Sequence, residues 1–244
     1  MKKVLLVTGG GRGIGAATCR LAARAGYAVV VNYQSDKFAA ESLAKEIGGL
    51  AIQADVSKPD DVARMFSEFE SKLGRITHVV NSAGATGKSS KLVDADLETI
   101  RQTLDINLFG TILVAREAVK RMSIRLGGTG GVIVNISSGA ASIGSANEFV
   151  WYAASKAGVD AFTLGLGREV AEEGIRVVAV APGLIDTELH ARSTGEPDRV
   201  NRMRDVIPMK REGAADEVAK TILFLLSDAA SYITATTIRV SGGR

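Results

Sequence analysis

Short runs of hydrophobic residues alternate with longer amphipathic segments along most of this chain of 244 residues. The hydrophobic runs are rich in β-branched residues and nearly uninterrupted, as in the three valines at 29–31, which is typical of strands covered on both faces. The amphipathic segments have the spacing of helices with one buried face. We therefore expect strands at residues 4–8, 28–32, 50–53, 78–81, 132–137, 176–181 and 237–240, and helices at 13–25, 37–47, 58–73, 95–125, 150–173 and 215–226.

This alternation predicts an α/β fold: a Rossmann-like, doubly wound parallel sheet of about seven strands with helices on both faces. No linker, repeat or shift in composition divides the sequence, so we expect a single domain over residues 1–244. Residues 184–212 break the pattern with six acidic and six basic side chains and two prolines. They follow a predicted strand whose end faces the ligand side of such a sheet, so we expect a substrate loop or lid there.

Glycines cluster directly after the first predicted strand. The chain has 27 glycines, about 11% against a usual ~7%, and five of them fall within residues 9–15. Glycine lets the backbone turn tightly and lets phosphate oxygens approach it, and the helix that follows points its positive N-terminus at them. The turn therefore predicts a dinucleotide-binding site, with these residues in contact with the cofactor: Gly9, Gly11, Arg12, Gly13, Ile14 and Gly15.

The end of the second predicted strand indicates which dinucleotide binds. The strand ends in polar residues, and neither Asn32 nor Ser35, both expected at the cofactor, is the carboxylate that would bind the free ribose 2′-hydroxyl of NAD. Arg12 can pair with the 2′-phosphate of NADP, although Asp36 lies close to it in the sequence. We therefore expect NADP (NADPH) in preference to NAD.

Tyr152 and Lys156 lie four residues apart in a predicted helix, so they share one face. At a separation of ~4 Å and an effective dielectric constant of ~20, an ammonium group would favour the phenolate by roughly 4 kcal/mol, about three pKa units. That shift would bring the pKa of Tyr152 towards neutrality, where acid–base catalysis works best. Ser138 follows the predicted strand at 132–137 and can hold a substrate carbonyl.

With these motifs the sequence resembles the short-chain dehydrogenases/reductases over essentially its whole length. Six features match that family in the right order: Thr-Gly-x-x-x-Gly-x-Gly at 8–15, Asn-Ser-Ala-Gly at 81–84, Asn107, Ser138, Tyr-x-x-x-Lys at 152–156, and Pro-Gly at 182–183 with Ile185 and Thr187. The segment between Ser138 and Tyr152 is about one residue longer than is usual in the family. Because that segment borders the substrate, the resemblance does not transfer a substrate.

The resemblance implies a catalytic tetrad of Asn107, Ser138, Tyr152 and Lys156. Tyr152 would exchange the hydroxyl proton, Ser138 would bind the carbonyl oxygen, Lys156 would bind the nicotinamide ribose and lower the tyrosine pKa, and Asn107 would hold a water that relays protons. It also implies a homotetramer built partly on the helix that carries Tyr152. Further cofactor contacts, besides Tyr152 and Lys156, are implied at Asp55, Val56, Asn81, Ala83, Gly84, Pro182, Gly183, Ile185 and Thr187.

The expected function is NADP-dependent hydride transfer between the nicotinamide and a small-molecule ketone or secondary alcohol, with 3-oxoacyl thioester reduction as one candidate. A sugar or polyol dehydrogenase of the same family is the alternative, and a cofactor-binding regulator without chemistry is the alternative of another class. The complete tetrad argues against the regulator. Electrostatics do not favour nucleic acid, because the net charge is only +3 and no basic stripe is present.

The remaining composition bears on disulfides, metal sites and membrane segments. The single cysteine, Cys19, excludes a disulfide framework, and two distant histidines do not indicate a metal site. No hydrophobic run has the length of a signal-peptide core or of a membrane-spanning helix. We expect a cytoplasmic protein without metal or membrane partners.

Overall fold

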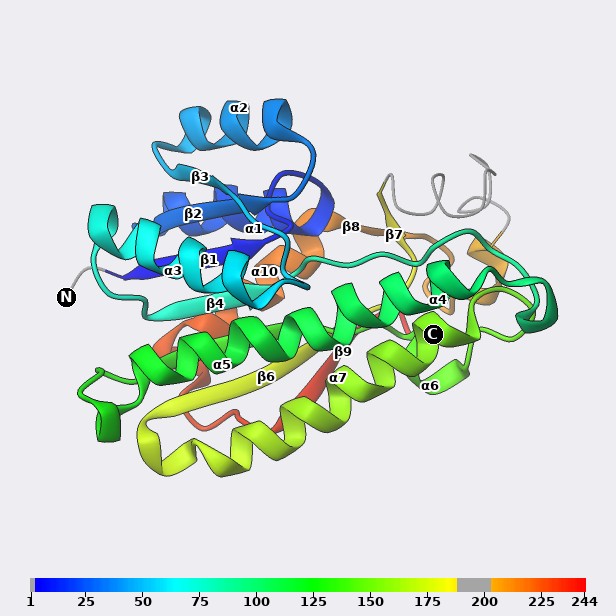
Figure 1. Ribbon diagram of the computed structural model, residues 1–244. Helices are drawn as coiled ribbons and strands as arrows, with labels where there is room; N and C mark the ends of the chain where they lie inside the picture. The colour runs from blue at the N-terminus through cyan, green and yellow to red at the C-terminus, as the bar shows by residue number, and fades with distance from the viewer. Residues whose placement is uncertain (1–2, 188–202) are drawn as a thin grey trace.

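Seven parallel strands form the central sheet of the computed structural model, which describes residues 3–187 and 203–244 (Figure 1). Their order is β3-β2-β1-β4-β5-β6-β9, so the chain reverses its direction of growth between β1 and β4. This arrangement confirms the predicted doubly wound sheet and places a ligand crevice at the carboxyl ends of those strands. The strands are β1 (Val4–Thr8), β2 (Ala28–Tyr33), β3 (Leu50–Gln53), β4 (His78–Asn81), β5 (Gly131–Ile136), β6 (Ile175–Pro182) and β9 (Thr236–Val240).

Helices cover both faces of the sheet because successive strand residues point to opposite sides. In β1, Leu5 and Val7 pack with α1 (Gly13–Arg24), α2 (Lys37–Ile47) and α10 (Ala215–Leu226) in one buried cluster. Val4 and Leu6 of the same strand belong to the second cluster. That cluster includes side chains of α3 (Pro59–Leu73), α5 (Gly110–Met122) and α7 (Val150–Glu169), the layer in front of the sheet in Figure 1.

The helix expected at 95–125 is divided. Its first part is α4 (Leu97–Leu104), a π-helical turn follows at Asp105–Phe109, and α5 then runs to Met122. Hydrophobic spacing does not reveal such a wide turn, because residues on either side keep helical dihedral angles. Helix α7 packs closely beside this turn at Gly158, where a Cβ would lie 2.9 Å from Leu108 Cδ2, so a larger residue there would require the Leu108 side chain to move.

Several short elements complete the described chain. The helix expected at 150–173 ends at Glu169 and is followed by a single 3-10 turn. No helix in the parts of the chain that the structure describes has the length and hydrophobicity needed to span a membrane. Residues 188–202 of the expected substrate loop lie outside the described residues. The short elements are the strands β7 (Ile185–Asp186) and β8 (Gly213–Ala214), which pair in parallel, the helix α6 (Ala140–Ile143), and 3-10 turns at Leu92–Asp94, Ile124–Leu126, Ala171–Glu173, Arg204–Val206 and Asp228–Ala230.

Candidate active site

A cleft of about 560 Å³ opens where β1, β4, β5 and β6 end. It lies at the carboxyl edge of the sheet, where open α/β sheets bind ligands. Most of the site residues predicted from the sequence line this single cleft: Gly9, Arg12, Gly13, Ile14, Gly15, Ala83, Gly84, Ser138, Tyr152, Lys156, Pro182, Gly183, Ile185 and Thr187.

The glycine turn between β1 and α1 has the shape of a phosphate cradle. Gly9 and Gly13 have φ angles of 60° and 50°, in the left-handed region that favours glycine. A Cβ on Gly15 would lie 2.5 Å from the Gly9 carbonyl oxygen, so no larger residue fits there. Helix α1 begins with no side-chain cap and no acidic residue in its first turn. Its first amide groups and its dipole therefore suit a dinucleotide pyrophosphate.

Two buried polar side chains hold the loops around this cradle. The Asn32 side chain accepts a hydrogen bond from Gly9 N at 3.3 Å and donates one to Ala54 O at 3.1 Å. The Thr8 hydroxyl accepts hydrogen bonds from the amides of Ser82 and Ala83 at 3.0 and 3.1 Å. Asn32, expected at the cofactor, is therefore a buried support of the turn and does not line the cleft.

The region expected to bind the adenosine half lies beside the cleft. Asp36 caps α2 by accepting a hydrogen bond from Ala39 N at 3.0 Å, and it forms an ion pair with Arg12. Asp55 accepts hydrogen bonds from the Ser57 hydroxyl at 2.6 Å and from Gln34 Nε2 at 3.0 Å. The other residues expected there are Gly11, close to Ala40, the exposed Ser35, and Val56, which packs against Gly110.

Tyr152 of α7 and Ser138, which follows β5, line the same cleft. Burial raises the pKa of Tyr152 above its usual value, while interaction with the Ser138 hydroxyl lowers it. The expectation that Lys156 lowers the pKa of Tyr152 is wrong for this structure. The Lys156 ammonium lies 5.9 Å from the centre of the Tyr152 ring and donates a hydrogen bond to Ile136 O at 2.7 Å. Its own pKa falls to about 8, because burial disfavours the charge more than Asp160 favours it.

Asn107 lies behind the cleft, buried in the π-helical turn. Its amide group donates to Ala85 O and accepts from Ala85 N, both at 2.8 Å. It also donates to Ser155 Oγ at 3.0 Å, and that hydroxyl donates to Tyr152 O at 2.7 Å. Asn107 therefore joins the loop after β4 to the helix that carries Tyr152.

Asn81, the other buried asparagine expected at the cofactor, lies within the sheet. Its Nδ2 donates to Asn135 Oδ1 at 2.9 Å, and Asn135 Nδ2 donates to Thr163 Oγ1 at 2.9 Å. Oδ1 of Asn81 is buried and has no hydrogen-bond partner among the described atoms. This chain of amides fixes the ends of β4 and β5 against α7, directly beneath the cleft.

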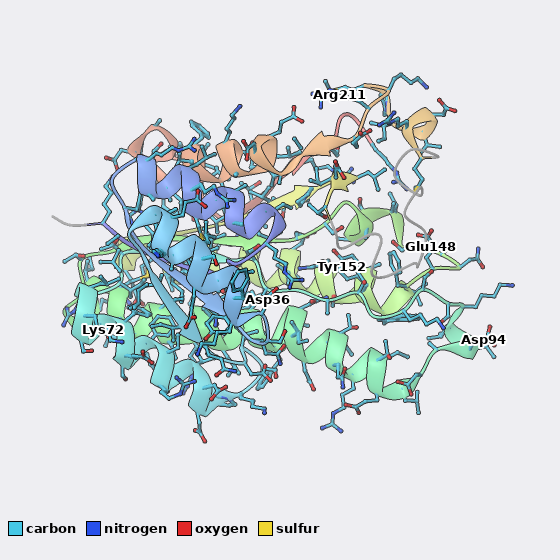
Figure 2. All side chains as sticks on the ribbon, turned by 90° about the horizontal axis from the view of Figure 1, so that it is seen from above. Asp36, Lys72, Asp94, Glu148, Tyr152 and Arg211 are labelled. Atoms are coloured by element: carbon cyan, nitrogen blue, oxygen red, sulfur yellow. The ribbon has the colours of Figure 1, made fainter. Side chains whose placement is uncertain are left out.

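The far wall of the cleft comes mostly from the two segments expected to border the substrate, but Arg239 and Arg244 were not expected there. It contains side chains from three segments remote in sequence: Ile143, Ser145, Glu148 and Phe149 before α7, Met203, and Arg239 and Arg244 near the C-terminus. In Figure 2, Tyr152 lies between Asp36 and Glu148, which marks the adenosine side and the far wall. A positive φ of 48° at Ser145 and of 65° at Asn147 shapes this wall, and no spacing rule signals it.

Comparisons with known proteins agree with this geometry. A family model described as enoyl-(acyl carrier protein) reductase matches residues 9–244. The chain is 47% identical to the uncharacterized oxidoreductase YgfF of Escherichia coli (strain K12), over 99% of both chains. It is 40% identical to a 3-oxoacyl-(acyl-carrier-protein) reductase of Synechocystis sp., over 99% of this chain and 96% of that one. A crystal structure of a 3-ketoacyl-(acyl-carrier-protein) reductase from Brucella melitensis complexed with NADH is similar with a TM-score of 0.92 and 34% identity, covering 99% of this chain and 98% of that chain.

Proposed function

Because this chain belongs to the short-chain dehydrogenase/reductase family, we propose that it is an NADP-dependent enzyme that reduces a ketone to a secondary alcohol in the cleft at the sheet edge. The observation that carries the proposal is the pair of hydroxyl groups of Tyr152 and Ser138, which line the same cleft as the glycine turn and interact with each other. Catalysis needs a proton donor and a carbonyl-binding group within reach of one atom, and this pair supplies both.

Each residue of the tetrad has a distinct part in the proposal. Ser138 binds the carbonyl oxygen, and Tyr152 donates its hydroxyl proton to that oxygen. The raised pKa of Tyr152 keeps the phenol protonated at neutral pH, which favours reduction over alcohol oxidation. Lys156 would bind the nicotinamide ribose. Asn107 is a positioning residue, since its amide group is used by Ala85 and Ser155, and its expected water relay stays a prediction.

The nicotinamide cofactor supplies the hydride when it is bound. The glycine turn would hold its pyrophosphate, and the segment Pro182–Thr187 would face its nicotinamide. We propose NADP over NAD because no carboxylate ends β2 and because Arg12 lies on the cleft wall at that side. Asp36, which pairs with Arg12, is the competing group.

For the substrate, we favour 3-oxoacyl thioesters or similar ketones over sugars and polyols. The relatives named as 3-oxoacyl reductases support the choice. So do the hydrophobic side chains of Ile143, Phe149 and Met203 on the far wall, since a sugar needs several hydrogen-bonding partners.

The test is Tyr152→Phe, which keeps the ring and removes the proton donor. NADPH-dependent reduction of a ketone panel should fall by roughly 10²–10⁴-fold, while the Kd for NADPH stays within about twofold. Tyr232→Phe is the matched control, because the Tyr232 side chain is fully exposed. Turnover that survives in Tyr152→Phe would reject the mechanism.

We also propose a homotetramer in the cytoplasm. One face of α7 leaves small and hydrophobic side chains exposed, namely Ala154, Ala157, Ala161 and Leu164. Small residues allow two helices to pack closely, so this face suits contact with a second copy.

A further inference from the structure

Arg239 extends from β9 towards the residues that follow Ser138. The register of β6 and β9 places it beside Ala181, one residue before the start of the Pro182–Gly183 segment. Its Nη2 donates a hydrogen bond to Ser142 Oγ at 2.6 Å, although the two residues are 97 positions apart. Ser142 Oγ in turn donates to Gly139 O at 3.0 Å. These bonds hold the guanidinium group beside the segment that begins with the carbonyl-binding serine.

The charge of Arg239 is not balanced by an acid. Across residues 3–187 and 203–244, no carboxylate forms an ion pair with it. Glu148 carries the one acidic side chain among the described residues that line the cleft, and the Arg244 side chain lies on the far wall as well. Arg12, at the adenosine side, is paired with Asp36. Within the described residues, Arg239 therefore presents to the cleft a guanidinium group that is not paired with a carboxylate.

The guanidinium group has donors to spare. It carries five N–H donors in a planar fork, and among the described residues one of them is used, on Ser142. Such a fork matches the paired oxygens of a carboxylate or phosphate. An arginine on an edge strand can also serve only to prevent aggregation, but that role needs neither a position on the cleft wall nor a bond to Ser142.

We propose that Arg239 determines specificity by binding an anionic group of the ketone substrate, a carboxylate or a phosphate. The inference rests on the proposed ketone reductase function, because Tyr152 and Ser138 define where the carbonyl group lies. It adds a second point of attachment at the far wall.

The experiment compares related ketones with and without an anionic group. The pairs are acetoacetate with methyl acetoacetate, and dihydroxyacetone phosphate with dihydroxyacetone, so that the arms separate a carboxylate from a phosphate. The wild type should prefer the anion of at least one pair by about 10- to 100-fold in kcat/KM, as expected for a charge-assisted hydrogen bond. Arg239→Gln should remove that preference and leave the neutral ketones within about twofold, whereas Arg239→Lys should restore part of it.

Arg125→Gln is the control for net charge. Arg125 lies before β5, at the opposite edge of the sheet, and pairs with Glu172 at 2.8 Å. It should leave both preferences unchanged. Equal use of charged and neutral ketones by the wild type, or a preference that survives in Arg239→Gln, overturns the inference while the reductase function stands.

Calorimetry of the same anions with the NADP⁺-loaded protein separates the two proposals. Anion binding that depends on Arg239 without turnover of any ketone supports the anion site and rejects the reductase function. Absence of both turnover and Arg239-dependent binding rejects both proposals.

Discussion

Arg12→Gln tests the choice of cofactor. Arg12 lies on the cleft wall, and its side chain is 38% exposed in its ion pair with Asp36. A guanidinium and a phosphate oxygen at ~4 Å attract by ~1 kcal/mol in water and ~4 kcal/mol at an effective dielectric constant of ~20. Solvent screening and competition from Asp36 reduce this attraction, so we expect Arg12 to contribute about 1–2 kcal/mol to the binding free energy of NADP⁺. Arg12→Gln should therefore weaken NADP⁺ binding by about 5- to 30-fold.

NAD⁺ lacks the 2′-phosphate, so its affinity should change by no more than about twofold. Asp36→Asn should act in the opposite sense and tighten NADP⁺, because it removes the competing charge. Asparagine caps a helix as well as aspartate does, so α2 should keep its stability. Arg20→Gln is the matched control, since Arg20 lies on α1 in a similar pair with Glu46 at 2.8 Å but does not line the cleft.

Dissociation constants for both cofactors, measured by fluorescence or calorimetry at fixed ionic strength, decide the matter. If Arg12→Gln weakened the binding of NAD⁺ and NADP⁺ equally, Arg12 would not be a contact of the 2′-phosphate. Tighter binding of NAD⁺ than of NADP⁺ by the wild type would refute the choice itself.

Two further predictions concern α7. Burial lowers the pKa of Lys156 from 10.5 to about 8, so its ammonium group destabilises the fold below pH 8, and this cost disappears as the pH rises towards 10.5. The gain in Tm of Lys156→Met over the wild type should therefore be largest at pH 7. Thermal unfolding measured at pH 7, 9 and 10 should show this gain falling as the pH rises. A gain that stays constant over this range would contradict a cost from the buried ammonium group. Ala161→Arg should reduce the mass seen by light scattering from that of a tetramer to that of a smaller species while the circular dichroism spectrum stays unchanged, and an intact tetramer would exclude this face from assembly.

The bounds of many strands and helices could be predicted, because the local sequence pattern favours the same elements that the tertiary structure contains. Strands β1, β3 and β4 and helix α2 have the predicted bounds, since each is a hydrophobic or amphipathic run bounded by turn residues or caps. The π-helical turn at Asp105–Phe109 could not be predicted, because one extra residue within a helical turn barely disturbs the hydrophobic spacing.

The structure brings most of the predicted site residues into one cleft, but the electrostatics at Tyr152 and Lys156 differ from the expectation. Tyr152 and Lys156 share a helix face as expected, yet the effect of Lys156 depends on where its ammonium group points. That group donates to Ile136 O, a contact with another element that helix spacing cannot supply. Arg239 was missed for a similar reason, since only the pairing of β6 with β9 brings it to Ser142.

The two sides of the cleft differ in whether main-chain or side-chain atoms form them. The cofactor side is largely main chain, where Gly9, Gly13 and Gly15 leave almost no freedom to substitute. Apart from Arg239 on β9, the far wall consists of side chains on segments outside the central sheet, so replacing Ile143 or Phe149 alters the pocket without disturbing a strand. Over evolutionary time such a protein can acquire new substrates by single mutations while its cofactor site stays constant. For enzyme engineering, the far wall is accordingly the region to randomise and the glycine turn the region to leave intact.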